Sequence, residues 1–211
     1  MDALEHFEQR RDRWEFYQGF GSPSLNITVR FGCADFVSPC KRTGTPVFHF
    51  FLHKLCRAVL ATPAFRLRWN GREVVEERGL RPSYTVNAAN GQLNFAVFEF
   101  ADDWDLFLKR SLEAKRLAEA APRLQIDAPG VYDYLFCTCM PWFDFTSIQH
   151  PTDAGHNHTI PSFAIGRIQP KDGRLELPLS VQVHHGLVDG VHIRAFLERL
   201  EAEIAEGAAR L

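Results

Sequence analysis

Apolar and polar residues alternate along residues 179–184, where leucine and valine are separated by serine and glutamine. Such alternation is typical of a strand that buries one face. The pattern runs into two adjacent histidines, His184 and His185, whose side chains must then point to opposite faces of the strand. A turn with glycine at both ends, residues 186–190, follows them. The stretch therefore predicts a strand that ends in a histidine pair at a tight turn.

A helical pattern begins directly after this turn. Apolar residues recur there at the spacing of an amphipathic helix that packs one face on a core; they are Ile193, Phe196, Leu197, Leu200 and Ile204. We therefore expect an imidazole at a mouth between the end of a strand and the start of a helix.

The rest of the chain mixes both patterns. Residues 5–18 predict one charged helix, and Thr45 and Pro46 predict the start of another, with Thr45 as its cap. Asn70-Gly71 predicts a hairpin turn. Strands are expected over residues 25–29, 73–76, 83–87 and 95–100 and from about Val131, and a helix from Asp102 to about Ala120. This irregular alternation indicates an α+β fold, which we predict to be a single domain over residues 1–211.

Composition narrows the class of protein. The formal net charge of -2 over 211 residues gives no electrostatic reason to expect a nucleic-acid or membrane partner. No apolar run approaches the roughly 20 residues that span a bilayer. Five irregularly spaced cysteines argue against a disulfide framework, so we expect a cytoplasmic protein. The 18 phenylalanines favour large apolar contacts, within or between subunits.

The histidine pair can do acid–base chemistry. Imidazole has an unperturbed pKa near neutrality, which suits it to take a proton from a weak nucleophile. Asp189 lies four residues after His185, where its carboxylate could hold the turn or orient the ring. A histidine pair at a strand end can also be ordinary core. The spacing His-His-x-x-x-Asp-Gly, with a strand before it and a helix after it, favours the catalytic interpretation.

This spacing resembles the HHxxxDG signature of the chloramphenicol acetyltransferases, and the acyltransferase cores of 2-oxo acid dehydrogenase complexes carry a shorter relative of it. Four other segments are similar to the first family: residues 10–17, 62–67, 135–142 and 178–183. The resemblance spans nearly the whole chain. It implies a two-layer sandwich in which helices pack on a mixed, largely antiparallel sheet. It also implies a homotrimer with its sites at the subunit interfaces and acetyl-coenzyme A as co-substrate, without a metal.

The resemblance assigns four catalytic positions. His185 would be the general base that deprotonates a substrate hydroxyl, and chloramphenicol would be that substrate. Thr138 stands where the family has a serine whose hydroxyl donates to the oxyanion, and threonine keeps the donor. Arg10 would pair with Asp189 in a structural ion pair that fixes the turn. Direct contact of a carboxylate with His185 is not implied.

The resemblance also assigns binding positions. Phe16, Tyr17 and Phe95 would line the acceptor pocket. Trp142 would pack against the pantetheine arm of coenzyme A, and Ile168 stands where some relatives place a tyrosine against the adenine.

Several positions depart from the family pattern. His150, Thr152 and Ser162 replace aliphatic residues of the acceptor pocket, and Ala164 stands where many relatives have a threonine. Chloramphenicol would find fewer apolar partners here. An acetyltransferase with a different hydroxyl acceptor, or a non-catalytic trimeric binding module, are therefore alternatives. A dehydrogenase-complex core is disfavoured, because the chain has no lipoyl-type domain, no Pro/Ala-rich linker and no arginine after the second histidine.

Three groups could suggest metal binding. His49 and His53 lie four apart on a predicted helix, but no third ligand is identifiable nearby. Cys137 and Cys139 fall on one face of a predicted strand, where core packing explains them. His150, His156 and His158 occupy a turn-rich segment that we expect to be a flexible polar loop.

Overall fold

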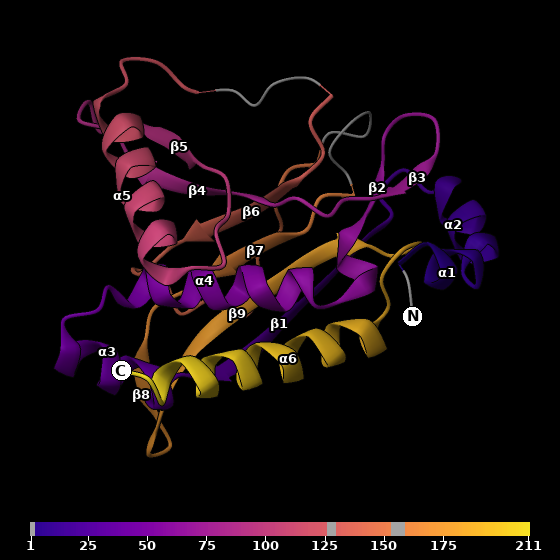
Figure 1. Cartoon of the computed structure of the whole chain (residues 1–211). Coiled ribbons are helices and arrows are strands. Elements are labelled where there is room, and N and C mark those ends of the chain that lie inside the picture. The colour runs from indigo at the N-terminus through magenta and orange to yellow at the C-terminus, as the bar shows by residue number, and fades with distance from the viewer. Residues whose placement is uncertain (1–2, 126–129, 153–158) are drawn as a thin grey trace.

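The centre of the computed structural model, which describes residues 3–125, 130–152 and 159–211, is a twisted sheet of seven strands (Figure 1). Its order is β1-β9-β7-β6-β4-β5, and β8 pairs with the first residues of β9, 174–176. The β7–β6 and β6–β4 pairs are parallel and the others antiparallel. The strands are β1 (Ser24–Gly32), β4 (Arg81–Asn87), β5 (Leu93–Val97), β6 (Tyr134–Cys139), β7 (Ser162–Ile165), β8 (Gln169–Lys171) and β9 (Arg174–His184).

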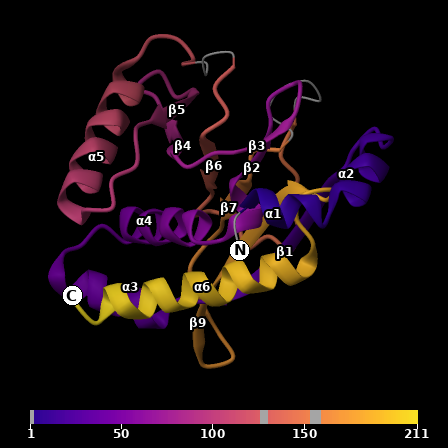
Figure 2. The ribbon, with the colours of Figure 1, turned by 45° about the vertical axis from the view of Figure 1, so that its right-hand side comes forward.

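Four long helices cover one face of this sheet: α3 (Ala34–Thr43), α4 (Val47–Leu60), α5 (Trp104–Ala120) and α6 (Gly190–Ala208). Figures 1 and 2 show α4 and α6 running side by side in front of the strands, with α5 beside β4 and β5. The predicted α+β sandwich of helices on a mixed, largely antiparallel sheet is confirmed.

The short N-terminal helices α1 (Ala3–Glu8) and α2 (Arg11–Gln18) lie at one end of the sheet (Figure 1). A 3-10 turn, η1 (Pro63–Arg66), and a hairpin of β2 (Leu67–Trp69) and β3 (Val74–Glu76) lie beside them. The hairpin turns where Asn70-Gly71 predicts it, because the Asn70 side chain accepts the backbone N–H groups of Arg72 and Glu73.

Strand β9 explains how the core and the opposite face separate. Leu179, Val181 and Val183 are almost fully buried in the hydrophobic cluster under the helices. The intervening Ser180 and Gln182 point the other way, where both bind the side chain of Asn26 on β1. The alternation in the sequence thus places an apolar layer on one face and a polar network on the other.

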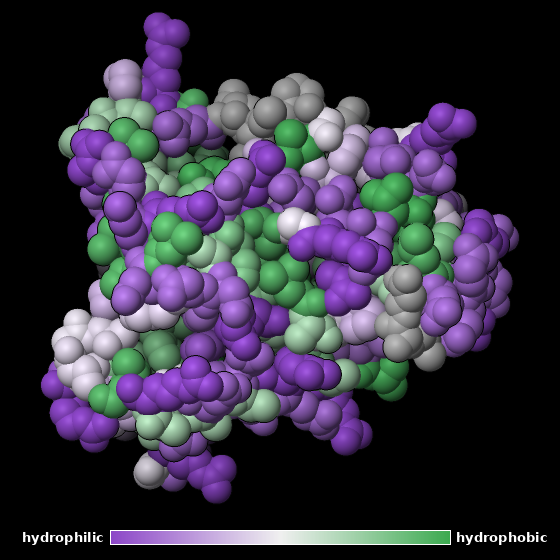
Figure 3. Space-filling model, viewed as in Figure 1, coloured by the Kyte–Doolittle hydropathy of each residue, from purple (hydrophilic) through white to green (hydrophobic). Residues whose placement is uncertain are grey.

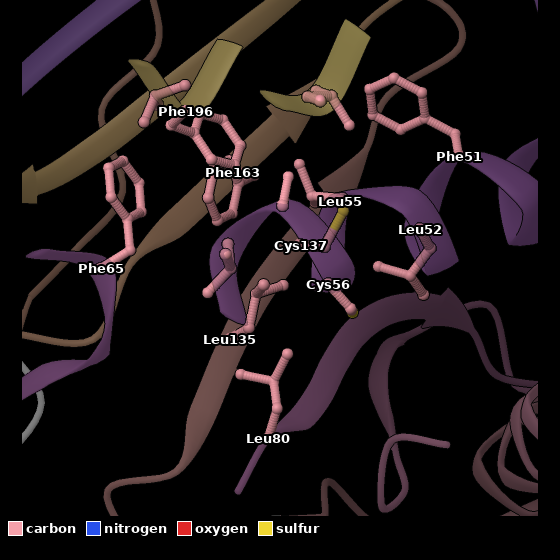
Figure 4. Packing of buried hydrophobic residues seen from close by; sticks show 14 of the residues in the cluster. Phe51, Leu52, Leu55, Cys56, Phe65, Leu80, Leu135, Cys137, Phe163 and Phe196 are labelled. Atoms are coloured by element: carbon pink, nitrogen blue, oxygen red, sulfur yellow. The ribbon is translucent and has the colours of Figure 1, made fainter. Parts of the chain in front are cut away.

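Aromatic rings join α6 to the sheet. The Phe65 ring stacks on Phe196 with centroids 4.7 Å apart, and Phe163 of β7 lies 5.4 Å from the same Phe196 ring. Figure 4 shows these three rings meeting beside Leu55 and Cys137. Because Phe196 belongs to the second turn of α6, this packing fixes the start of the helix, and with it the turn after β9.

Some element boundaries differ from the sequence prediction. The helix expected over residues 5–18 is two helices, broken at Gln9 and Arg10. The cap of α4 is Pro46 rather than Thr45. The strand expected over residues 95–100 is β5, which ends at Val97.

The helix-covered face is largely hydrophilic, with hydrophobic residues gathered toward its middle (Figure 3). Within the described residues, no helix combines the length and the apolar character needed to cross a membrane.

Candidate active site

Backbone hydrogen bonds shape the turn that links β9 to α6. The amides of Leu187 and Val188 both donate to the carbonyl of His184, at 3.0 Å each. The amide of Gly186 donates to Nδ1 of the His184 ring at 3.1 Å. On the other side, the amide of His185 donates to the carbonyl of Pro23 at 2.8 Å. These hydrogen bonds therefore fix the backbone of both histidines at the end of β9.

The two rings have different surroundings. His184 is 1% exposed, and its ring lies 4.7 Å from that of the buried Trp14. The His185 side chain is 32% exposed and stacks on Tyr17, with centroids 4.4 Å apart and 23° between the planes. The side chains diverge as the strand pattern predicts. His185 presents its ring toward the surface, while Nδ1 of that ring is buried.

Arg10 reaches this turn from the break between α1 and α2. Its guanidinium donates to both carboxylate oxygens of Asp189, at 2.5 and 2.8 Å, and at 3.4 Å to the carbonyl of His185. The hydrogen bonds from Arg10 hold the pKa of Asp189 below its usual range. Oδ1 of Asp189 lies 3.3 Å from Nδ1 of His185 without hydrogen-bond geometry. Arg10, Asp189, His185 and Tyr17 thus form one compact group.

Two further aromatic residues extend this group outward. Phe16 and Phe20 are 62% and 49% exposed. The ring centroids of Phe16, Tyr17 and Phe20 lie 5.1–5.5 Å from one another. The sequence interpretation includes Phe16 and Tyr17 but misses Phe20. Its four-residue spacing from Phe16 across the end of a predicted helix was the available signal.

Thr138 lies elsewhere on the sheet. It is opposite Ala164 on β7, which is opposite Ser180 on β9, and His184 lies four residues farther along β9. Strand rise and strand spacing put the Thr138 and His185 positions of one chain roughly 19 Å apart. One chain therefore does not bring these two predicted residues together.

A polar clamp holds the segment before residue 153 over the sheet. The side-chain amide of Gln182 accepts the His150 N–H at 2.9 Å and donates to the His150 carbonyl at 3.2 Å. Asn26 donates to the Ile148 carbonyl at 2.5 Å. The His150 ring has a buried Nε2 without a hydrogen-bond partner, and burial lowers the pKa of this histidine.

The other predicted acceptor-pocket residues occupy different settings. Ser162 is buried on β7 directly opposite Gln182, close to the clamp. Thr152 is exposed. Phe95 is partly buried on β5, opposite Thr85. His156 and His158 lie outside the described residues.

A cavity of about 320 Å³ opens between the helices and the ends of β6 and β7. Its lining is mostly apolar, and Arg167 adds one cation to the wall. Ile168 lines it, and Trp142, 61% exposed, is next to the lining residue Pro141. The other main contacts come from Phe48, Phe51, Cys139 and Ile165. Both predicted coenzyme positions are thus at or beside one cavity.

The candidate metal residues are core residues. His49 and His53 are 7% and 2% exposed on α4, and burial lowers the pKa of both to about 4. Burial likewise raises the pKa of the Cys139 thiol to about 11. In the part of the chain that the structure describes, no three His, Cys, Asp or Glu side chains gather as a metal site.

Comparison with known proteins extends these observations. A solved structure of a chloramphenicol acetyltransferase superposes with a TM-score of 0.78 at 25% identity, covering 92% of this chain and 94% of that one. A dihydrolipoamide acetyltransferase of Azotobacter vinelandii shares the fold with a TM-score of 0.64 at 21% identity, covering 95% of this chain and 86% of that one.

Curated relatives are similarly distant but nearly full in length. A chloramphenicol acetyltransferase of Klebsiella sp is 27% identical over 91% of this chain and 88% of its own length. One of Campylobacter coli is 26% identical over 91% of this chain and 92% of its own.

The fold and these relatives define an acyltransferase. The family model described as chloramphenicol acetyltransferase matches residues 3–201, so the chain belongs to the chloramphenicol acetyltransferase family. The chain is therefore an acyltransferase rather than a non-catalytic binding module. The family implies an acyl-coenzyme A co-substrate and a small-molecule acceptor.

Proposed function

We propose that this protein transfers the acetyl group of acetyl-coenzyme A to the hydroxyl of a small molecule, with His185 as general base. The observation that carries the proposal is the setting of His185. Its ring is stacked on Tyr17, its backbone is bound to Pro23 and Arg10, and the ring is partly open to solvent. An imidazole held this rigidly at a surface can meet a hydroxyl in one orientation.

The position of the ring suggests which nitrogen acts. Nδ1 of His185 is buried toward Asp189, so Nε2 is the nitrogen available to a substrate. Nε2 would take the hydroxyl proton as the oxygen attacks the thioester carbonyl. The carbon–sulfur bond then breaks, and the coenzyme A thiolate recovers the proton from His185. Arg10 and Asp189 would hold the turn, and neither would exchange a proton.

The Thr138 hydroxyl is the proposed donor to the oxyanion of the intermediate. Two groups acting on one tetrahedral centre must each lie about 3 Å from a reacting atom. A separation of roughly 19 Å along the sheet of one chain is far too long for that. The site we propose therefore takes His185 from one copy and Thr138 from a neighbour, which supports a homotrimer with interfacial sites.

The cavity beside β6 is the proposed path for the acyl donor. Its mostly apolar wall suits a pantetheine arm, which Trp142 would cover at the mouth. Ile168 would face the adenine without a ring to stack on it. Cys139 lines the cavity, whereas its strand neighbour Thr138 points to the opposite face of the sheet, so the acyl group would have to pass the end of β6 to reach the proposed oxyanion donor.

Two kinds of acceptor substrate are candidates. Chloramphenicol is the acceptor that the names of the relatives specify. An acceptor with a polar body is favoured by one observation: His150 is clamped to Gln182 and keeps a buried Nε2 without a partner. A buried nitrogen of this kind costs free energy unless a ligand hydrogen-bonds to it. We further propose a cytoplasmic location, because all five cysteines are free thiols.

The test is a thiol-release assay with acetyl-coenzyme A, chloramphenicol and a panel of small alcohols. The wild-type protein should release thiol only when an acceptor is present. His185→Ala should abolish release while the fold and the oligomer persist. Near-normal turnover by His185→Ala would refute the base assignment. His150→Leu should raise turnover of chloramphenicol relative to the alcohols, and a loss of both would argue against the polar-acceptor alternative. Growth of a susceptible host under chloramphenicol provides the cellular readout.

A further inference from the structure

His192 occupies the third position of α6, directly above the catalytic turn. Its Nδ1 accepts the backbone N–H of Asp189 at 2.9 Å. The first amides of a helix lack partners within the helix, and a side chain at this position commonly returns to bind the cap residue. Glutamate or glutamine usually makes that bond, and here an imidazole makes it.

The bond sets the state of the ring. Because Nδ1 accepts, the proton of neutral His192 must be on Nε2. A protonated ring would present an N–H to the Asp189 N–H, and the bond would be lost. His6 of α1 lies edge-on at 4.6 Å, and Arg10 is also close. Burial and these two groups outweigh the Asp189 carboxylate and lower the pKa of His192 to about 4.

The Asp189 carboxylate takes part in the same cap. Asp189 and His192 form a capping box, in which the Asp189 side chain accepts from the His192 backbone and the His192 ring accepts from the Asp189 backbone. Here both oxygens receive hydrogen bonds from Arg10, which also donates to the carbonyl of His185. A continuous chain of contacts therefore runs from His192 through Asp189 and Arg10 to His185.

We infer that His192 is a positioning residue for His185, and that its neutral imidazole holds the Asp189 amide so that Arg10 can fix the catalytic turn. This inference rests on the proposed function. His192 touches no substrate in this scheme. It acts through Asp189 and Arg10, and acid that protonates it releases the turn.

The test compares His192→Gln with His192→Leu. Glutamine can restore the acceptor and does not titrate, whereas leucine cannot accept. We expect His192→Leu to lower kcat about tenfold at every pH with an unchanged KM for acetyl-coenzyme A. His192→Gln should keep at least about half of kcat, and it should remove the part of the stability loss between pH 6.5 and 4 that protonation of His192 causes. Wild-type kcat in His192→Leu, or a pH dependence of Tm that is unchanged in His192→Gln, would overturn the inference.

A second readout works without a known acceptor. Diethyl pyrocarbonate modifies neutral, accessible imidazoles, and fragment-ion mass spectrometry can follow His185 alone. His192→Leu should change the rate at His185 by about threefold or more, and His192→Gln should restore it. This pattern in a protein that acetylates nothing would refute the proposed function and support the positioning role. An unchanged rate in His192→Leu, in an enzyme that does transfer acetyl, would overturn the positioning role alone.

Discussion

The phenol ring of Tyr17 lies almost flat on the imidazole of His185, with 4.4 Å between centroids and 23° between planes. Tyr17 comes from the end of α2 and His185 from the turn after β9, so two distant segments fix one ring. Tyr17 also contacts Phe16 and Phe20, which are largely exposed. The surface beside the proposed base is therefore aromatic.

Tyr17→Leu should lower kcat by up to about tenfold, because an aromatic pair contributes roughly 1 kcal/mol beyond the area it buries. Tyr17→Phe keeps the stacking surface and should retain most of the activity. Steady-state kinetics with any accepted alcohol would measure both. Equal losses in the two variants would show that the hydroxyl, rather than the stack, matters.

Arg10→Ala should reduce stability more than it changes coenzyme A affinity. Arg10 is buried and binds both oxygens of Asp189, so its loss leaves a partly buried carboxylate without its cation. We expect a cost of about 2 kcal/mol, which lowers Tm by roughly 4–8 °C for a chain of this length.

The neighbouring Arg11 offers a matched control. It pairs with Glu8 on the surface, and both side chains are more than half exposed. Arg11→Ala should therefore leave Tm nearly unchanged. Thermal unfolding and a coenzyme A titration separate the two variants. A larger effect of Arg10→Ala on affinity than on Tm would count against a structural ion pair.

Gly186→Ala should disturb the turn. A Cβ at this position would lie 3.0 Å from Cε1 of His184 and 3.1 Å from the backbone of Trp14, tighter than ordinary contacts. Because the added Cβ would push on His184 and Trp14 in the turn that carries His185, we expect about a tenfold loss of kcat and a loss of about 1 kcal/mol of stability. Gly21→Ala, with nothing within 4 Å of its Cβ, is the control and should be silent. Full activity of Gly186→Ala would mean that the turn adapts easily.

His49→Phe should flatten the pH dependence of stability. His49 stays neutral in the folded protein until pH about 4, whereas the unfolded chain takes up a proton near pH 6.5. The unfolded state therefore binds more protons between these values, and stability falls as pH is lowered from 6.5 to 4. The difference of 2.5 units corresponds to about 3 kcal/mol for this residue.

Phenylalanine at position 49 removes that contribution, and Nε2 of His49 has no hydrogen bond to lose. Urea unfolding at pH 7 and pH 4.5 measures the change. His53→Phe should flatten the curve as well, but it also loses the contact of Nε2 with the Asp102 carbonyl and should cost about 1 kcal/mol at pH 7. Parallel curves for wild type and His49→Phe would contradict the expected titration.

Local patterns in the sequence predicted the strand–turn–helix unit well. The alternation along β9, the histidine pair and the helical spacing in α6 all depend on near neighbours, and the structure reproduces them. The hairpin at Asn70-Gly71 is local in the same sense. The ion pair of Arg10 with Asp189 spans 179 positions and was accessible only through resemblance.

Other features were not predicted. Helix α3 contains Pro39, which argues against a helix in any sequence pattern, yet the proline lies in the middle of its ten residues. The turn at Asp172 and Gly173 between β8 and β9 did carry a local signal, because Asp-Gly is a hairpin dipeptide, but it was not among the predicted turns. Two helices replace the one expected over residues 5–18, and the break between them places Arg10 at the turn after β9.

The candidate site shows the same division. Residue types identified His185 and Asp189, but the distance between Thr138 and His185 follows from strand order, which no local pattern contains. The Gln182 clamp on His150 joins residues 32 positions apart and forms only once the sheet is assembled. The bond of His192 to the Asp189 amide is local, but an imidazole takes the place of the usual glutamate or glutamine of a capping box, so the usual pattern does not predict it.

The sheet positions of Thr138 and His185 carry a genetic consequence. In the proposed trimer every site takes one group from each of two copies, so His185→Ala and Thr138→Val protomers should each be inactive alone but active when mixed. Coexpressed mixed trimers should then regain up to about a third of their sites. A chain that carries both substitutions should restore neither single variant, so complementation between two inactive alleles would support the proposed sharing of each site between two subunits.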